Sequence, residues 1–313
     1  MDLKQLTSDV FYTLIFPGFL FTAVVGLFLT WVDRKVTAVV QSRVGPPWYQ
    51  PYADIGKLMT KKMIVPRGSS RIGFMVVPLL AIAGSTLAAV IVFRALLAPE
   101  AGFVGDIIVL IYLSALPAIA LIIGGSSSRS PFGAVGASRE MSMVLAYEVV
   151  FLLSIVVVLM KVRSILFANI IAYQVQNGPI AFSISGFLAL VIMLFCIQAK
   201  LGFLPFDISE AETELIGGPL AEYSGSGLAL FKLSRAMMFL YLPVLVVLLF
   251  MGGASPTLLS VVGFILKLLG VLVLLILVKI THARLRLDQM LHLFWGKLAI
   301  IGLAAIIFAL LGL

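Results

Sequence analysis

Acidic side chains placed within apolar sequence are the residues of this chain that could do chemistry. Five of the 14 acidic residues lie within 25 positions, in residues 200–224 (KLGFLPFDISEAETELIGGPLAEYS). Two more, Glu140 and Glu148, lie at the start of a long apolar run. A carboxyl group withheld from water has a raised pKa and can exchange protons near neutral pH. These residues therefore predict proton or charge transfer.

Glu140 and Glu148 belong to one predicted helix. Their separation of eight residues corresponds to a rise of about 12 Å and a rotation of about 80°, so both could open on one cavity. A carboxylate near the membrane midplane costs at least about 2.5 kcal/mol, so it must be protonated, paired or in contact with water. One interpretation is a proton relay. The alternative is a buried acid neutralised by a basic residue of a neighbouring span (Lys232, Arg235 or Lys267).

Other kinds of chemistry have no basis in the sequence. Cys196 is the only cysteine, and one thiol cannot hold an iron–sulfur cluster or a structural zinc. His282 and His292 have no accompanying pattern of metal ligands. The sequence motifs of nucleotide-binding loops, zinc proteases and serine hydrolases are missing from the chain. We therefore expect this chain to bind no metal and no cofactor.

The elements that must position the acids are membrane helices. The chain has 313 residues, of which 62% are hydrophobic and 12% charged, and its mean hydropathy is +1.17. Such a composition is typical of an integral membrane protein. The net charge of +8 arises from basic residues at the ends of apolar runs, so it indicates membrane topology and not nucleic-acid binding.

The apolar runs predict an all-α polytopic membrane protein that forms a single integral membrane domain over residues 1–313. A span requires about 20 apolar residues. Eight runs meet this length, and short amphipathic helices and a structured acidic loop on the cytoplasmic side complete the expected fold. The predicted spans are about 10–32, 74–94, 106–124, 140–161, 181–201, 227–250, 257–280 and 291–312.

The positions of Lys and Arg predict the orientation. Fourteen of the 22 basic residues lie on one side of the predicted spans and four on the other, with the remainder inside spans. The richer side is cytoplasmic by the positive-inside rule, which places both termini outside the cytoplasmic membrane. The connections expected on the cytoplasmic side are 33–73, 125–139, 202–226 and 281–290.

The 33–73 connection is predicted to contain two short helices. One carries Val36, Val39 and Val40 and stops before Gly45, and the other runs from Pro51 to about Lys61 with Ile55, Leu58 and Met59 on one face. This connection could lie among lipid headgroups, or it could form a shelf for a soluble partner. On the opposite side, 161–180 is predicted to be a partly amphipathic surface segment.

The acidic loop cannot be one continuous helix. Pro205, Pro219 and several glycines interrupt it. Its acids alternate with apolar residues, so we expect the loop to fold back against the protein and line a cavity, where non-helical backbone is tolerated.

Four blocks of sequence resemble a known family. These are DRKVTAVVQSRVGP, GASREMSMVLAYEV, LPFDISEAETEL followed by EYSG, and HARLRLDQM. Their order and spacing are similar to those of the membrane subunit that joins the two arms of respiratory complex I, called NuoH in bacteria. The resemblance extends from about Asp33 to Met290 and implies the same eight-span fold.

The chain departs from complex I at one place. The complex I family has Glu-Thr-Asn-Arg-Ala in its quinone-chamber region, where this chain has Lys200–Leu204. Glu140 after Arg139, and the Gly218–Gly225 block, instead resemble group 4 membrane-bound [NiFe] hydrogenases, formate hydrogenlyase and related sulfur-reducing complexes. The resemblance therefore implies a complex that takes electrons from ferredoxin or formate and does not depend on a quinone.

The resemblance also implies roles for individual residues. The acids would form a charged cavity at the foot of the hydrophilic arm, Arg139 and Lys200 would be their counter-charges, and four basic residues would hold peripheral subunits or lipid headgroups. The implied relay acids are Glu140, Glu148, Asp207, Glu210, Glu212, Glu214 and Glu222, and the implied contact residues are Arg34, Lys35, Arg284 and Arg286.

The implied partners are hydrophilic-arm subunits, namely a [NiFe]-hydrogenase-like large subunit and an Fe–S subunit, together with antiporter-like membrane subunits. Fe–S clusters and a NiFe centre would belong to those partners. The resulting hypothesis is an ion-translocating coupling subunit. The alternatives are the quinone-site subunit of a true complex I, a passive anchor whose acids only bind a partner, and a stand-alone secondary transporter. The inverted repeats typical of transporters are not evident.

Overall fold

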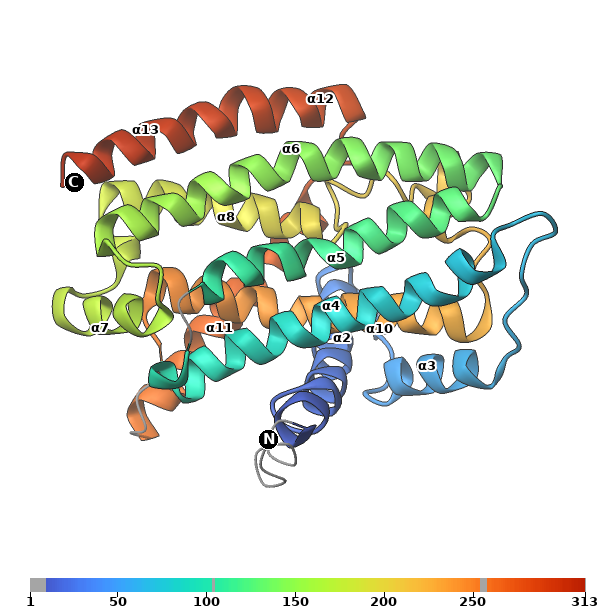
Figure 1. The fold of residues 1–313 in the computed structure, drawn as a ribbon, viewed down its shortest axis with the longest axis horizontal. Coiled ribbons are helices and arrows are strands. Elements are labelled where there is room, and N and C mark those ends of the chain that lie inside the picture. The colour runs from blue at the N-terminus through green and yellow to red at the C-terminus, as the bar shows by residue number, and fades with distance from the viewer. Residues whose placement is uncertain (1–9, 103–104, 254–257, 313) are drawn as a thin grey trace. The chain divides into compact units, whose positions relative to one another are not determined.

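The described part of the chain is helical. The structure, a computed structural model, describes residues 10–102, 105–253 and 258–312, apart from the side chains of residues 101, 212 and 213. Helices connected by short loops make up these residues, which contain no β-strand (Figure 1). The prediction of an all-α polytopic membrane protein is therefore confirmed.

The principal helices follow one another along the chain with short connections. They are α2 (Phe19–Val40), α3 (Gln50–Thr60), α4 (Arg71–Leu97), α5 (Asp106–Ser127), α6 (Pro131–Val162), α7 (Phe167–Asn177), α8 (Ile184–Lys200), α9 (Glu212–Leu215), α10 (Gly225–Val246), α11 (Leu258–Thr281), α12 (Leu287–Leu291) and α13 (Ala299–Leu310). Two π-helical turns, Val247–Met251 (η4) and His292–Leu298 (η5), extend α10 and precede α13.

Seven helical segments of the described chain are long and apolar enough to cross a membrane. They match seven of the eight predicted spans. The eighth, predicted at 181–201, corresponds to α8, a shorter apolar helix of 17 residues whose N-terminus is capped by Ser183. The Ser183 hydroxyl oxygen accepts a hydrogen bond from the Gly186 backbone N–H at 3.1 Å, which satisfies one of the otherwise free amide groups of the first turn.

Two helices extend beyond the predicted spans. The first span was expected to end near residue 32, yet α2 continues to Val40, because no helix-breaking residue precedes Gly45. The fourth span was expected to follow a loop over 125–139, yet α6 begins at Pro131. Proline is favoured in the first turn of a helix, where its missing N–H has no partner to lose. Arg34, Lys35 and Arg139 therefore lie on helices and not in loops.

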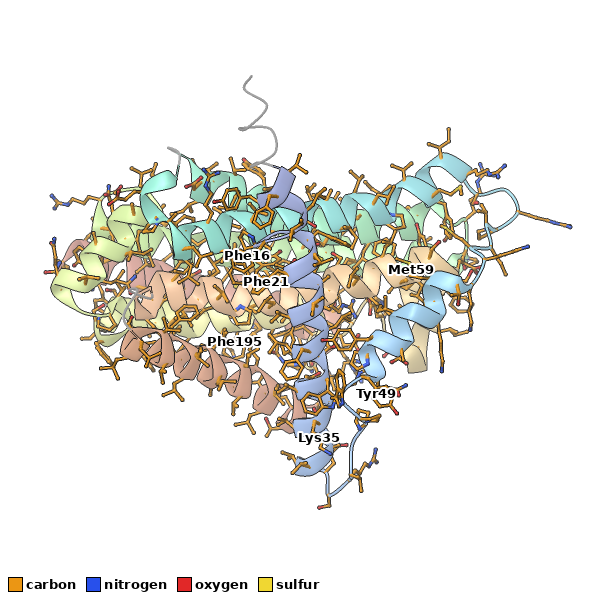
Figure 2. The ribbon with its side chains drawn as sticks, turned by 90° about the horizontal axis from the view of Figure 1, so that it is seen from below. Phe16, Phe21, Lys35, Tyr49, Met59 and Phe195 are labelled. Atoms are coloured by element: carbon orange, nitrogen blue, oxygen red, sulfur yellow. The ribbon has the colours of Figure 1, made fainter. Side chains whose placement is uncertain are left out.

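Two short helices were predicted correctly. α3 agrees with the helix expected from Pro51 to Lys61, and α7 lies within the amphipathic segment expected over 161–180. The apolar face of α3 is only partly buried in the protein, because Tyr52 and Ile55 pack there while Met59 is 47% exposed (Figure 2).

The contacts of the chain group into two compact units. The first contains residues up to Val90, Tyr112–Met141 and Asp207–Tyr241, and the second contains Ile91–Ile111, Ser142–Phe206 and the residues from Leu242 onward. Four helices (α4, α5, α6 and α10) contribute residues to both. The prediction of one domain over the whole chain stays a prediction.

The first unit has two apolar clusters. In one, Ala23 and Leu27 of α2 pack with Leu233 and Met237 of α10, and Tyr52 of α3 covers them. The Tyr52 hydroxyl donates a hydrogen bond to the Val24 carbonyl oxygen at 2.9 Å, which fixes α3 to α2. The other cluster joins α4, α5 and α10 to the end of the acidic loop through Phe74, Ala120, Phe231 and Tyr223.

The second unit is assembled around α8. Helix α13 packs along α8, and Gly302 of α13 lies close to Leu153 of α6 and Ile192 of α8. The amphipathic helix α7 is held to the π turn η4 by Gln174, whose amide nitrogen donates to the Leu248 carbonyl oxygen at 2.9 Å.

Candidate functional site

The first unit gathers charged side chains around Glu140, a set that we call the Glu140 cluster (Glu140, Asp207, Ser209, Glu210 and Arg235). Glu140 lies on α6 and is 7% exposed. Its carboxylate accepts a hydrogen bond from the Ser209 hydroxyl and lies in the electrostatic range of the other three residues. The cluster therefore holds three carboxyl groups and one guanidinium in a largely buried place.

Arg235 of α10 and Glu210 of the acidic loop form a bidentate ion pair. Arg235 Nη1 donates to Glu210 Oε2 at 2.8 Å, and Nη2 donates to Oε1. Arg235 is the single cation among the five residues of the cluster. The cluster thus contains one guanidinium and three carboxyl groups.

The loop is held against the helices by close backbone contacts. Gly218 has a φ of +53°, and a Cβ added there would lie 1.9 Å from the Ser209 carbonyl oxygen, so only glycine fits. A Cβ on Gly136 of α6 would lie 2.6 Å from the Cδ of Pro219. The small residues at the start of α6 therefore let the acidic loop approach Glu140 closely.

Tyr223 anchors the other end of the loop. Its ring stacks on that of Phe74 with centroids 4.0 Å apart, and its hydroxyl donates to the Phe74 carbonyl oxygen at 3.2 Å. Burial raises the pKa of the Tyr223 phenol, so the ring stays neutral. The acidic loop thus folds back on the helices as predicted, with Ile208 and Leu215 buried.

Arg139, next to Glu140, faces the outer part of the same loop. Its Nη1 donates to Glu214 Oε2 at 2.7 Å, and the two side chains are 28% and 55% exposed. An exposed pair of this kind contributes about 0–1 kcal/mol, so it helps to place the loop more than it stabilises the fold.

The second unit contains a more deeply buried ion pair. Lys200 Nζ, at the end of α8, lies 2.5 Å from Glu148 Oε1 on α6, and the Lys200 side chain is 1% exposed. The ammonium group also lies 4.4 Å from the centroid of the Phe151 ring and 5.4 Å from that of Tyr147, at cation–π distances. Glu148 Oε2 is buried and has no hydrogen-bond donor in the described part of the chain.

The two oxygens of the Glu148 carboxylate have different surroundings. Lys200 satisfies one carboxylate oxygen, and the other has free lone pairs in a poorly solvated place. Glu148 and Lys200 therefore form a buried ion pair in which one carboxylate oxygen is open to a further donor.

The remaining predicted residues are more exposed or occupy other places. Glu222 is exposed, Asp207 is half-buried, and the side chain of Glu212 lies outside the described residues. Arg284 is half-buried, and Arg286 is exposed. The functional roles assigned to all of these residues stay predictions.

Two of the predicted contact residues are bonded within the first unit. Arg34 Nη1 donates to Asp54 Oδ2 of α3 at 2.9 Å, and Lys35 Nζ donates to the Val44 carbonyl oxygen at 2.6 Å. Figure 2 shows Lys35 near the end of α2. Burial disfavours the charged form of Asp54, but hydrogen bonds from Arg34 and Gln50 outweigh it and lower the pKa of this carboxyl.

Ser209 and Asp54 were missed by the sequence reasoning, and Arg235 was considered only as a counter-charge for a buried acid. An arginine within an apolar span requires an acidic partner, which is the signal that points to Arg235. Within the described residues no group of three or more His, Cys, Asp and Glu side chains is arranged to hold a metal ion.

Comparison with known proteins places the chain in a family. Residues 13–310 match the family model described as NADH dehydrogenase. The H-type subunit of NADH-quinone oxidoreductase from Carboxydothermus hydrogenoformans is 32% identical over 324 residues, which cover 98% of this chain and 91% of that protein. The protein of the same description from Neisseria meningitidis serogroup C is 32% identical over 301 residues, covering 90% and 84%.

A solved structure is also similar. It is a chain of the membrane-bound sulfane sulfur reductase, described as an archaeal respiratory membrane complex, with a TM-score of 0.84, 28% sequence identity, and coverage of 93% of this chain and 96% of that one. The family resemblance inferred from the four sequence blocks is confirmed. The chain is a multi-pass membrane protein that belongs to the NADH dehydrogenase family, as a NuoH-type component of complex I-like membrane complexes.

Proposed function

We propose that this chain is the ion-translocating coupling subunit of a ferredoxin-fed, energy-converting membrane complex of the hydrogenase or sulfur-reductase type. It would anchor the redox arm and relay charge to antiporter-like subunits. Electrons would stay in the partner subunits, a [NiFe]-hydrogenase-like large subunit and an Fe–S subunit, and this chain would bind no redox centre. It would lie in the cytoplasmic membrane with both termini outside, as the distribution of Lys and Arg predicts.

The buried Glu148–Lys200 pair is the observation that carries this proposal. Ionisable residues inside membrane spans are costly and usually belong to ion pathways. Glu148 has one oxygen on Lys200 and one oxygen without a donor in the described chain, which is the arrangement a proton carrier needs. The Glu140 cluster adds carboxyl groups that outnumber their cation.

The type of complex is supported by two observations. Lys200 occupies the position where the complex I pattern has the first residue of its Glu-Thr-Asn-Arg-Ala block, and it is engaged with Glu148. The solved structure described above comes from a sulfane sulfur reductase. We therefore favour an acceptor other than quinone, either protons or a sulfur compound.

The decisive experiment replaces Glu148 by Gln in the whole complex and reconstitutes it in liposomes. With reduced ferredoxin as donor, we expect proton or sodium uptake to be lost, while reduction of the terminal acceptor with an artificial donor is largely retained. Glu100→Gln, at an exposed acid in a connection between helices, is the matched control and should pump normally. Ion uptake by the Glu148→Gln complex equal to that of the unaltered complex would defeat the proposal.

A second candidate is the quinone-site subunit of a quinone-reducing complex, because the relatives from Carboxydothermus and Neisseria are described as parts of NADH-quinone oxidoreductase. The two candidates differ in a direct assay. If the purified complex reduces a short-chain quinone, and a quinone-site inhibitor blocks both this reduction and ion uptake, the second candidate is correct.

A further inference from the structure

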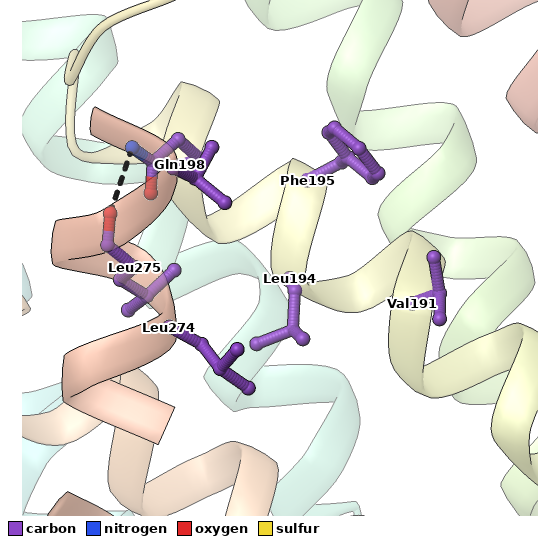
Figure 3. A pocket seen from close by; sticks show the side chains of 7 residues that line it. Val191, Leu194, Phe195, Gln198, Leu274 and Leu275 are labelled. Atoms are coloured by element: carbon purple, nitrogen blue, oxygen red, sulfur yellow. Dashed lines mark hydrogen bonds between the residues drawn. The ribbon is translucent and has the colours of Figure 1, made fainter. Parts of the chain in front are cut away.

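The facing sides of α8 and α11 in the second unit leave an apolar groove between them. Its volume is about 100 Å³, and the residues that line it include Val191, Leu194 and Phe195 of α8 and Leu274, Leu275 and Val278 of α11 (Figure 3). Toward the N-terminal end of α8 the same side of the helix stays open, because Ile184 and Phe187 are each 57% exposed. On α11, Gly270 is exposed, and a Cβ added there would meet no atom within 4 Å. Both helices therefore present an open apolar side next to the groove.

Lys267 lies on this side of α11, deep within the apolar helix. Gly270 and Leu274 follow it by three and seven residues, spacings that place the three residues on one face. Lys267 follows the first residue of α11, Leu258, by nine positions and precedes the last, Thr281, by fourteen. These separations correspond to about 13 Å and 21 Å along the helix. An ammonium group at such a depth is costly unless polar or anionic groups compensate its charge.

The described part of the chain compensates Lys267 only in part. Its Nζ donates to the Met251 carbonyl oxygen at 2.6 Å, at the end of η4, where the carbonyl groups of a helix carry partial negative charge. An ammonium group has three N–H donors and a full charge, and no acidic side chain of the described residues forms an ion pair with Lys267. Residues 252–257 contain no acid, and Glu148, which lies within a span of the same unit, is already paired with Lys200. A carboxylate for Lys267 must therefore come from another molecule.

We propose that a transmembrane helix of another subunit lies along the open sides of α8 and α11 and carries an aspartate or glutamate that pairs with Lys267. The groove takes one apolar side chain of this helix, because a dry cavity of about 100 Å³ accepts a group of that size. Gly270 lets the backbone of the partner helix approach α11 closely, as small residues do between membrane helices. Lipid fits less well, because its phosphate lies about 15 Å from the membrane centre and its acyl chains carry no charge.

The chemistry of the site defines the partner. Its helix must be apolar enough to cross the membrane and must hold one carboxyl group away from its ends, at the depth of Lys267. The inference rests on the place of this chain among the components of complex I-like membrane complexes. It does not depend on the ion-translocating role proposed above, so each can fail without the other.

The first test identifies the acid in the unaltered complex. Membranes that contain the whole complex are treated with a carbodiimide that dissolves in the apolar layer. The reagent activates a carboxylate, a neighbouring amine attacks it, and an amide bond forms with the loss of water. Mass spectrometry of the digested complex should show Lys267 joined to an aspartate or glutamate within an apolar stretch of another subunit. A product that joins Lys267 only to residues of this chain would overturn the proposal.

The second test measures how firmly the complex retains that subunit during purification in detergent. Lys267→Met should reduce retention by about tenfold or more, because it leaves a carboxylate buried without its cation. Lys267→Arg keeps the charge and should restore retention. Leu269→Met is the matched control, since Leu269 is 43% exposed on nearly the opposite side of α11, and it should change nothing. If the Lys267→Met complex keeps every membrane subunit as firmly as the unaltered complex, the proposal is wrong.

Discussion

The buried pair of Glu148 and Lys200 makes a quantitative prediction about stability. At 2.5 Å and an effective dielectric constant of about 20, two unit charges attract each other by about 7 kcal/mol. Removing both ions from water costs several kcal/mol for each, so the net contribution of the pair is small. Removing one partner is different, because the other charge stays buried, and this costs about 3–5 kcal/mol.

The perturbation is a cycle of three variants: Lys200→Met, Glu148→Gln and the double substitution. We expect Lys200→Met to lower the thermal unfolding midpoint of the purified complex, because it removes one partner of a buried ion pair. Glu148→Gln should lower it as well, although Lys200 keeps its contacts with the ring faces of Phe151 and Tyr147. The double variant should recover most of the loss.

The assay follows thermal unfolding of this subunit within the complex by its resistance to protease after heating. The double variant is the discriminating one. If its loss of stability equals the sum of the two single losses, the side chains act independently and the reasoning about a coupled buried pair is refuted.

Three further predictions concern the first unit. Tyr223→Phe removes one hydrogen bond but keeps the stacked ring, so it should lower the stability of the fold by about 0.5–1.5 kcal/mol. The measurement is a small decrease in the thermal unfolding midpoint, and a decrease as large as that of Tyr223→Ala would contradict this account. Gly136→Ala should lower the stability of the fold by about 1–3 kcal/mol, because the new methyl group meets the backbone of the acidic loop. Gly263→Ala is the control: a Cβ there meets nothing within 4 Å, so this variant should be neutral or stabilising in the same assay. The pKa of the Asp54 carboxyl is lower in the folded protein than in the unfolded chain, so its pairing with Arg34 stabilises the fold above the unfolded pKa. This stabilisation is lost as the pH falls through the pKa of the folded protein. Protection from protease measured against pH should show the loss, and the loss should be smaller in Arg34→Gln.

The sequence predicted most of the elements, because membrane spans follow directly from apolar length. α7 was predictable because amphipathic periodicity is a local property, and the interrupted backbone of the acidic loop follows from Pro205 and Pro219. The start of α6 was missed because the glycine- and serine-rich composition of 125–139 suits either close backbone packing or a flexible connector. In the structure these small residues serve close packing, as Gly136 does against Pro219.

The pairings within the site were less predictable. Three basic residues inside spans were candidate partners for a buried acid, and the family resemblance implied Arg139 and Lys200 as counter-charges. In the structure Glu148 pairs with Lys200, which lies 52 positions away at the end of another helix. Arg235 pairs with Glu210. Charge and hydropathy show that a partner must exist, but they do not show which helices are neighbours. That depends on packing between segments distant in the sequence, such as the contact of the acidic loop with α4 through Tyr223 and Phe74.

The two-pronged attachment of Arg235 to Glu210 affects how variation among relatives should be interpreted. The planar guanidinium engages both oxygens of the carboxylate at once, whereas a lysine would offer a single compact ammonium group. A homologue with lysine at this position would keep the same formal charge, but its loop would be free to pivot about one bond. Alignments of this family that score the two amino acids as equivalent would therefore conceal a difference in how rigidly the glutamate is oriented.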